Sequence, residues 1–142
     1  TESDRQSLVE AVDNGTIDVI VSDHKPEDEE SKRLTFAQAA TGATGVETLL
    51  PLTLELFHNK SIGLKKLIAA VTSNPAKILG INKGSLDIGR DADLCIFDID
   101  KPWIVNKNEI KSKSKNTPIE DRKMQGQILK TFVKGEMAYE RL

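Results

Sequence analysis

The sequence predicts an α/β chain in which helices and one buried strand come first and a small β part follows. The helices are indicated by apolar residues that recur at helical spacing in the first half of the chain. The strand is indicated by residues 17–21, whose near-continuous apolar character is typical of strands buried on both faces of a parallel sheet. The pattern changes near residue 83, where turn glycines and strand-like alternation replace the helices. We therefore expect one part over residues 1–82 and a second over residues 83–142.

The first element expected is a helix over residues 3–13. Ser3 is its expected N-cap, because acidic and amide residues follow in the first turn. Gly15 is expected to end the helix, since glycine readily takes the left-handed conformation found after helix C-termini. The buried strand of residues 17–21 then completes half of an α/β unit. The apolar stripe of the helix consists of Leu8, Val9 and Val12.

Polar and glycine-containing segments follow the strand. Residues 25–30 are mostly acidic and predict a surface loop. Gly42 and Gly45 then flank a pair of small residues, and such glycines let a backbone turn tightly or approach a ligand closely. A well-buried helix is expected over residues 46–57, with Pro51 in its first turns, where proline is tolerated.

Two further helices complete the first part. Residues 63–72 predict an amphipathic helix. Asn74 is the expected cap, and Pro75 the expected first residue, of a short helix that ends at Gly80. His58, at the end of the preceding helix, is interpreted as a C-terminal residue that the helix dipole favours.

The second part is expected to consist of strands and loops. A strand is expected over residues 92–97, and the lysine-rich residues 107–117 predict an exposed loop. Near the chain end, Gly135-Glu136 predicts a two-residue turn between two strands. Cys95 lies in the first strand and is interpreted as a buried small hydrophobic side chain rather than a reactive thiol.

The composition is globular and argues against some classes of partner. With 38% hydrophobic residues, 30% charged residues and a formal net charge of −2, the charge gives no reason to expect nucleic acid or a membrane surface as partner. The apolar runs are far shorter than the ~20 residues of a membrane-spanning helix, and no signal-peptide pattern opens the chain. The single cysteine cannot form an internal disulfide, which favours the cytoplasm. The chain opens on Thr1 rather than Met, so we expect a segment of a longer protein.

The residues that carry chemistry stand at the end of the expected strand, in the run IDVIVSDHKPEDEE. In parallel α/β folds, ligand sites lie at the carboxyl ends of strands. Asp23 stands at such an end, and its carboxylate could bind a divalent metal or act as a general base. Alternatively, Asp23 caps the following loop through the loop's backbone. His24 could orient the loop or bind a ligand.

Six sequence elements, in chain order, carry a resemblance to a known family. Asp-His-x-Pro after an apolar strand resembles the last barrel strand of the amidohydrolase superfamily. TGATGVETLLPL resembles the dihydroorotases in its Gly-x-x-Gly-x-Glu-Thr-x-x-Pro-Leu pattern. SNPAKILGI and KGSLDIGRDADLCIFD resemble the superfamily's return from its barrel to its small β domain. SKSKNTP followed by GQILKTFVKGE is similar to the closing segment of dihydroorotases of the long, zinc-dependent type.

This resemblance implies the C-terminal part of a (β/α)8 metal-dependent hydrolase barrel plus strands of a small flanking β-sandwich domain. Residues 1–82 would supply the last barrel strand and helices, and residues 83–142 the C-terminal strands of the β domain. The family is a group of zinc-dependent cyclic amidohydrolases that interconvert dihydroorotate and N-carbamoyl-aspartate in pyrimidine biosynthesis. The resemblance therefore implies a small-molecule substrate and a homo-oligomeric enzyme of the cytoplasm.

The resemblance also implies roles for individual residues. Asp23 would bind the metal and carry a proton from water to the leaving nitrogen. The backbone at Thr41 and Gly42 would contact the substrate ring. Glu27 stands where the family often has a histidine that holds the substrate carboxylate. A glutamate there would repel that carboxylate unless Lys25 or another group compensates.

The family's metal site cannot be completed from this chain. The family uses a His-x-His pair, a carboxylated lysine and two further histidines, whereas this chain has two histidines in total. One carboxylate cannot hold a catalytic zinc, which takes three or more protein ligands. We expect the chain alone to bind no zinc and to hydrolyse nothing. Its unpaired strand edge is expected to associate with itself or with the rest of the protein.

The sequence is also compatible with two other functions. A dihydroorotase-like protein that lacks metal ligands would serve as a scaffold for aspartate carbamoyltransferase, although the presence of Asp23 favours the enzyme. Another cyclic amidohydrolase, of the hydantoinase or allantoinase kind, is the second. Glu27 leaves room for that possibility, whereas the Glu47-Thr48 pair argues against it.

Overall fold

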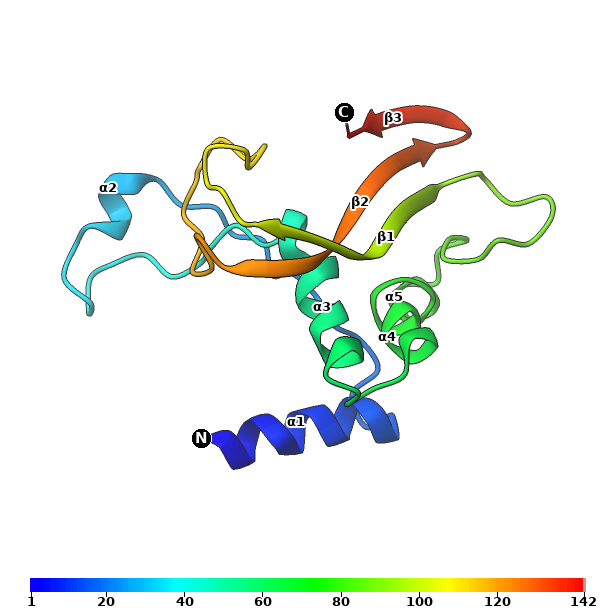
Figure 1. Cartoon of the computed structure of the whole chain (residues 1–142), viewed down its shortest axis with the longest axis horizontal. Coiled ribbons are helices and arrows are strands. Elements are labelled where there is room, and N and C mark those ends of the chain that lie inside the picture. Colours follow the sequence, from blue (N-terminus) through cyan, green and yellow to red (C-terminus); the bar gives the residue numbers. More distant parts are fainter. Residues whose placement is uncertain (142) are drawn as a thin grey trace.

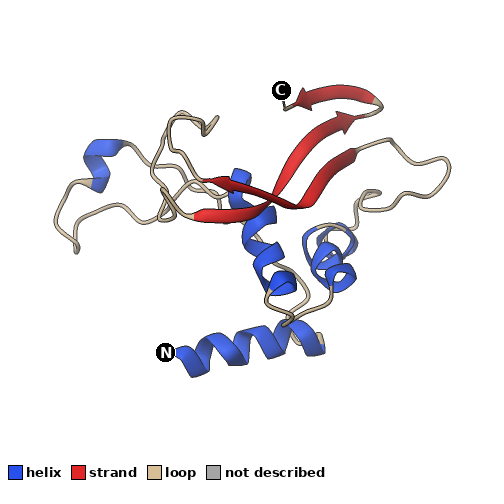
Figure 2. Cartoon of the chain, viewed as in Figure 1, coloured by secondary structure: helices blue, strands red, loops and turns tan. Residues whose placement is uncertain are grey.

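The chain is built from short helices and a three-stranded sheet, as Figure 1 and Figure 2 show for the computed structural model, which describes residues 1–141. Helix α3 runs from the sheet to α1, and the connection that carries α2 projects away from both (Figure 1). The helices are α1 Glu2–Asn14, α2 Glu29–Lys32, the 3-10 turn η1 Val46–Thr48, α3 Leu49–His58, α4 Leu64–Val71 and α5 Ser73–Ile78. The strands are β1 Leu94–Ile104, β2 Lys123–Val133 and β3 Glu136–Glu140.

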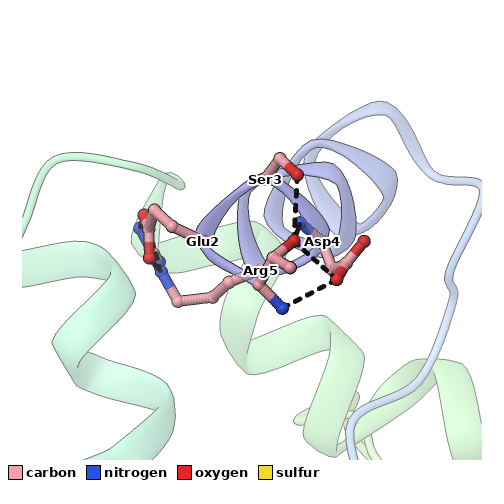
Figure 3. Close-up of polar contacts among 5 residues, drawn as sticks. Glu2, Ser3, Asp4 and Arg5 are labelled. Atoms are coloured by element: carbon pink, nitrogen blue, oxygen red, sulfur yellow. Dashed lines mark hydrogen bonds and ion pairs between the residues drawn. The ribbon is translucent and has the colours of Figure 1, made fainter.

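The N-cap of helix α1 lies two residues earlier than the sequence predicts, and the helix itself begins at Glu2. Thr1 is the N-cap rather than Ser3, because Thr1 and Asp4 form a reciprocal capping box. The Thr1 hydroxyl accepts from the Asp4 backbone N–H at 3.3 Å, and the Asp4 carboxylate accepts from the Thr1 amino group at 2.7 Å (Figure 3). The expected end is confirmed, since Gly15 follows the helix with a left-handed φ of 83°.

The segment at residues 17–21 is not part of a sheet in the described chain, so the prediction of a buried strand is wrong for it. Its backbone is held instead by other elements. The Ile17 N–H donates to Ala11 O at 2.9 Å, and the Ile20 N–H donates to Ala70 O at 3.0 Å. Ile17 and Ile20 pack inward, whereas Val21 is 69% exposed because no described strand lies beside it.

The first-half core joins α1, α3 and α4. Val12, Ile62 and Leu67 are buried together, and the partly buried side chains of Val9, Ile17, Ile20, Leu56 and Phe57 pack around them. The expected helices over 46–57 and 63–72 are thus confirmed, with Pro51 in the first turn of α3. The expected cap Asn74 is wrong. Thr72 precedes α5, and Asn74 lies inside it with its side-chain amide donating to Asp18 O at 2.8 Å.

A second contact presses α3 directly onto the backbone of β2. Leu54 is fully buried, and a Cβ placed on Gly126 would lie 2.4 Å from Leu54 Cδ1. A side chain at this position would displace Leu54, and the Gly126 φ of 97° also favours glycine. The Arg122–Glu55 ion pair at 2.8 Å and the His58 Nε2–Ile99 O contact at 2.9 Å join the same surfaces. His58 is the last residue of α3, as expected.

The sheet has the antiparallel order β1-β2-β3. The turn between β2 and β3 is Lys134-Gly135, one residue before the predicted Gly135-Glu136. Lys134 and Gly135 have φ values of 51° and 86°, and two consecutive left-handed residues match the twist of a tight hairpin. The predicted burial of Cys95 is wrong: it pairs with Thr131, away from the α3 contact, and is exposed.

Two predicted loops contain more structure than expected. Residues 25–30 lead into the surface helix α2 rather than forming a plain loop. The lysine-rich connection at 107–117 carries part-buried side chains that contact other segments. None of the described helices has the length and apolar character required to cross a membrane.

The fully buried side chain at the α3–β2 contact gives a first prediction. Leu54→Ala should lower the free energy of unfolding by about 2–5 kcal/mol, because it removes packed methyl groups and leaves a cavity against β2. Leu86→Ala is the matched control, since Leu86 is 85% exposed. Urea unfolding followed by circular dichroism measures both variants. Equal losses in the two would contradict this account of the contact.

Candidate functional site

Three segments that are distant in sequence meet around the turn at Asp23. They are residues 22–27, residues 41–48 and residues 111–118. None of them is part of the three-stranded sheet, and an isolated parallel bridge pairs His24 with Ala43. The site is therefore held by individual hydrogen bonds rather than by a regular ladder.

Asp23 is exposed and has an unusual backbone conformation. Its φ is 43°, in the left-handed region that few residues other than glycine occupy. Its carboxylate accepts no hydrogen bond from the described residues, so the loop-capping alternative does not occur there. The Asp23 carboxylate therefore has no hydrogen-bond partner among the described residues, whereas the nearby Lys25 backbone N–H donates to Ala43 O.

His24 orients the loop, which is one of the two roles weighed for it. Its Nδ1 accepts from the backbone N–H groups of Gly45 at 3.1 Å and Val46 at 3.3 Å. The Lys25 N–H donates to Ala43 O at 3.0 Å directly beside this contact. Residues 22–27 and 41–48 are thereby joined on both sides of the His24–Ala43 bridge.

The two glycines allow the close approach that their spacing predicts. A Cβ on Gly42 would lie 2.6 Å from Lys25 O, and Gly42 has a φ of 123°. A Cβ on Gly45 would lie 2.5 Å from Ser22 O. Both distances are shorter than real Cβ contacts, so each position requires glycine. The two glycines therefore approach backbone carbonyls on either side of Asp23, those of Lys25 and Ser22, rather than a ligand.

Glu27 does not carry an isolated charge. Its carboxylate lies 3.3 Å from Lys25 Nζ, and its side chain is 22% exposed. The Glu27 backbone N–H donates to Asn116 Oδ1 at 3.3 Å, and its carbonyl accepts from the Ser114 hydroxyl. Lys25 and Glu27 therefore form an ion pair beside the Asp23 turn.

Helix α2 supports the Thr41–Gly42 backbone. Asp28 caps this helix, and the Ser31 backbone N–H that donates to its carboxylate at 2.8 Å lowers the pKa of that carboxyl. Lys32, in the last turn, reaches back and donates to Ala40 O at 2.7 Å and Gly42 O at 2.9 Å. Thr41 is exposed, and its side chain makes no hydrogen bond within the described chain.

Glu47 and Thr48 hold the other end of the glycine segment. The Glu47 carboxylate accepts from the backbone N–H groups of Lys111 at 2.7 Å and Ser112 at 3.3 Å. Thr48 is buried, and its hydroxyl donates to Gly45 O at 3.2 Å. The Glu-Thr pair therefore connects the Asp23 region to the β1–β2 connection.

Asp23, Glu27 and Gly42 line two neighbouring hollows, whereas Thr41 lines neither of them. Asp23 lines one of about 590 Å³, whose walls include apolar side chains of α3. Glu27 and Lys32 line the other, of about 1120 Å³. Gly42 and Ala43 line both. Asp23 and Glu27 therefore face adjacent spaces separated by the glycine segment.

Sequence reasoning missed Asn116, Lys32 and Ser114. Asn116 lies in the run SKSKNTP, which resembles the family's closing segment, and the surrounding lysines predict an exposed loop. Asn followed by Thr-Pro is a turn signal, and that signal could have indicated local order. The residues next to Asn116 in sequence do not predict which distant segments it contacts.

A complete metal site is not found within the described residues. No group of three or more His, Cys, Asp or Glu side chains lies close enough to hold an ion there. The exposed Asp23 carboxylate fits one position of such a site, since it is an oxygen ligand without another partner. The described residues therefore offer one ligand and not the three or four that zinc takes.

Comparison with known proteins places this chain among hydrolases. Residues 1–138 match the model of the amidohydrolase family. The chain is 43% identical over 139 residues to a dihydroorotase of Ehrlichia canis and 41% identical over 138 residues to one of Aquifex aeolicus. These matches cover 98% and 97% of the chain but 31% and 32% of the relatives, so the chain spans about a third of their length.

Solved structures of related enzymes have the same fold over this region. An L-hydantoinase (dihydropyrimidinase) from Arthrobacter aurescens superposes with a TM-score of 0.86 at 35% identity, covering 94% of this chain and 31% of that one. A D-hydantoinase superposes with a TM-score of 0.89 at 22% identity, covering 99% of this chain and 32% of that one.

The close approach at Gly45 gives a second prediction. Gly45→Ala should destabilise the chain by about 1–3 kcal/mol, because the new methyl group overlaps Ser22 O and must displace the turn at Asp23. Gly63→Ala is the control, since a Cβ there meets nothing within 4 Å. Denaturant unfolding compares the two variants. A Gly45→Ala protein as stable as the control would contradict the described packing.

Proposed function

Because this chain belongs to the amidohydrolase family, we propose that it forms the C-terminal part of a dihydroorotase. The proposed enzyme reversibly hydrolyses dihydroorotate to N-carbamoyl-aspartate in pyrimidine biosynthesis. The observation that carries the proposal is the 43% identity to a named dihydroorotase over 98% of this chain. In this proposal residues 1–82 end a (β/α)8 barrel and residues 83–142 complete a small β domain. The exposed Val21 and the unpaired segment at 17–21 fit a strand whose neighbours come from elsewhere in the protein.

Asp23 is the proposed catalytic residue and metal ligand. A zinc ion, when bound, would supply a Lewis acid for the hydrolysis, and Asp23 would provide one of its ligands. The free carboxylate would also accept a proton from the attacking water and deliver it to the ring nitrogen as the amide bond breaks. The left-handed backbone at Asp23, held by contacts on both sides, suits a carboxylate that must keep one orientation.

Thr41 and Gly42 are the proposed contacts to the substrate ring. The Gly42 carbonyl already accepts from Lys32 and Asn116, so it is not free for a ligand. The backbone N–H groups of Thr41 and Gly42 donate no hydrogen bond within the described chain. Those two donors are suited to a carbonyl or carboxylate oxygen of the substrate.

The charge of Glu27 affects which cyclic amide the proposed enzyme can accept as its substrate. Dihydroorotate carries a carboxylate, which an unpaired glutamate would repel. Lys25 lies 3.3 Å from the Glu27 carboxylate, so the pair presents little net charge and permits an anionic substrate. Hydantoin hydrolysis is the second candidate, because the 35% identical structural neighbour is an L-hydantoinase (dihydropyrimidinase).

The decisive experiment measures dihydroorotate and hydantoin hydrolysis, with bound zinc, for the full-length protein and for this chain. We expect dihydroorotate activity and zinc in the full-length protein only. Hydantoin turnover alone would favour the second candidate. A full-length protein without zinc or activity would contradict both and favour a scaffold that binds aspartate carbamoyltransferase.

Asp23→Asn in the full-length protein should lower kcat by about 100-fold or more, because the amide cannot accept the proton. Asp18→Asn is the matched control, since it removes a carboxylate from the same segment five residues earlier. Steady-state kinetics and zinc content measure both variants. An Asp23→Asn enzyme with the activity of the control would rule out the proposed role of this carboxylate.

We also propose that the protein self-associates. Large apolar side chains such as Phe36, Leu86 and Ile88 are 103%, 85% and 106% exposed, and such surfaces favour association. We expect the mean mass of this chain to rise with concentration in small-angle X-ray scattering. Phe36→Ser with Ile88→Ser should reduce that rise. A compact monomer at every concentration would contradict the proposal.

A further inference from the structure

We propose that Asn116 is a positioning residue for the site, a role that rests on the proposed function. It stands in the β1–β2 connection, outside the segments that carry Asp23, Thr41 and Gly42. Its side chain and carbonyl nevertheless contact both of those segments. Asn116 acts by fixing their backbones relative to each other, without contacting the substrate.

The contacts of Asn116 use nearly all of its polar groups. Its Nδ2 donates to Gly42 O at 3.0 Å, and its Oδ1 accepts from the Glu27 N–H at 3.3 Å. Its carbonyl accepts from the Thr44 N–H at 2.9 Å and the Thr44 hydroxyl at 3.0 Å. The Ser114 hydroxyl lies 2.6 Å from Oδ1, but it shares its single hydrogen with Glu27 O, so the Glu27 N–H is the donor that fixes the amide's orientation. These bonds span 72 to 89 residues of sequence between Asn116 and its distant partners.

Only an amide meets all of these demands at once. One end of the side chain must donate to the Gly42 carbonyl, while the other must accept from the Glu27 N–H. An aspartate has the same shape but places an acceptor against Gly42 O, which is unfavourable. A shorter hydroxyl side chain would lose the reach to Gly42 or Glu27 while leaving the contacts of the carbonyl intact.

Movement at Gly42 would reach Asp23 through a short series of contacts. Gly42 packs against Lys25 O, and the next residue, Ala43, accepts from the Lys25 N–H at 3.0 Å. Gly45 packs against Ser22 O and donates to His24 Nδ1. The residues on both sides of Asp23 therefore contact the segment that Asn116 holds.

Lys32 and Asn116 both donate to the Gly42 carbonyl, but they connect it to different parts of the chain. Lys32 also donates to Gly42 O, at 2.9 Å, but it comes from the short surface helix α2. Asn116 is partly buried and comes from a connection that Glu47 holds at its other end. Asn116 thus links the site to the β part of the chain, which Lys32 does not.

The test uses Asn116→Asp in the full-length protein, with Asn108→Asp as the control. Asn108 lies in the same connection, is exposed, and its replacement introduces the same charge. We expect Asn116→Asp to lower kcat/KM for dihydroorotate by about 10- to 100-fold, mainly through a higher KM. A merely destabilised enzyme contains fewer active molecules, which lowers the apparent kcat and leaves KM unchanged. The control should stay within about twofold of the wild type.

Asn116→Ser keeps the test decisive if the aspartate variant does not fold, because it adds no charge. Hydrogen exchange provides a readout independent of activity: amides in residues 22–27 and 41–45 should exchange faster in either Asn116 variant, while those of α3 stay unchanged. Unchanged KM, an equal effect of Asn108→Asp, or unchanged exchange would each overturn the proposal. An inactive wild type would refute the proposed function instead, and hydrogen exchange would still test Asn116.

Discussion

The structure around Asp23 depends on satisfying the backbone polar groups of three irregular segments that no sheet ladder pairs. Buried N–H and C=O groups without partners cost free energy, and only a few backbone bonds, such as Lys25 N–H to Ala43 O and Thr44 N–H to Asn116 O, join these segments directly. The side chains of Asn116, Lys32, His24 and Glu47 supply further bonds, each to backbone groups of a distant segment. The site is thus organised by polar side chains, while the apolar core lies elsewhere, between α1, α3 and α4.

The two parts of the chain are also joined by close packing. Leu54 of α3 lies against Gly126 of β2, and the Arg122–Glu55 ion pair and the His58–Ile99 contact lie on the same surface. This contact sets where β2 lies and, through it, where the β1–β2 connection that carries Asn116 begins and ends. Packing at a fully buried leucine and hydrogen bonding at a partly buried asparagine are therefore linked steps in placing the Thr41–Gly42 backbone.

Local signals in the sequence predicted most helices, because spacing and termination depend on neighbouring residues. The predictions were wrong where a contact with another residue decided which residue caps a helix or whether a segment forms a strand. Ser3 has the right chemistry for an N-cap, but Thr1 forms the reciprocal pair with Asp4. Asn74 likewise suits a cap, but its side chain bonds to Asp18 O. The strand at 17–21 has the right composition, yet pairing depends on a neighbour, and none of the described strands lies beside it.

The close packing of the glycines at the candidate site was predictable from the sequence, whereas the contacts that support it were not. Asp23 and the glycines could be proposed as candidates because a carboxylate after an apolar run and closely spaced glycines have local signatures. The partners of Gly42 lie 10 and 74 residues away, and no periodicity records them. The resulting asymmetry is consistent with the role proposed for Asp23 as a reactive carboxylate. Hydrogen bonds hold the backbone on both sides of Asp23, while its carboxylate has no partner in the described chain. A loop cap would show the reverse, with its oxygens engaged. A ligand to metal or a proton carrier needs this arrangement, in which the main chain is fixed and the side chain is left free to react.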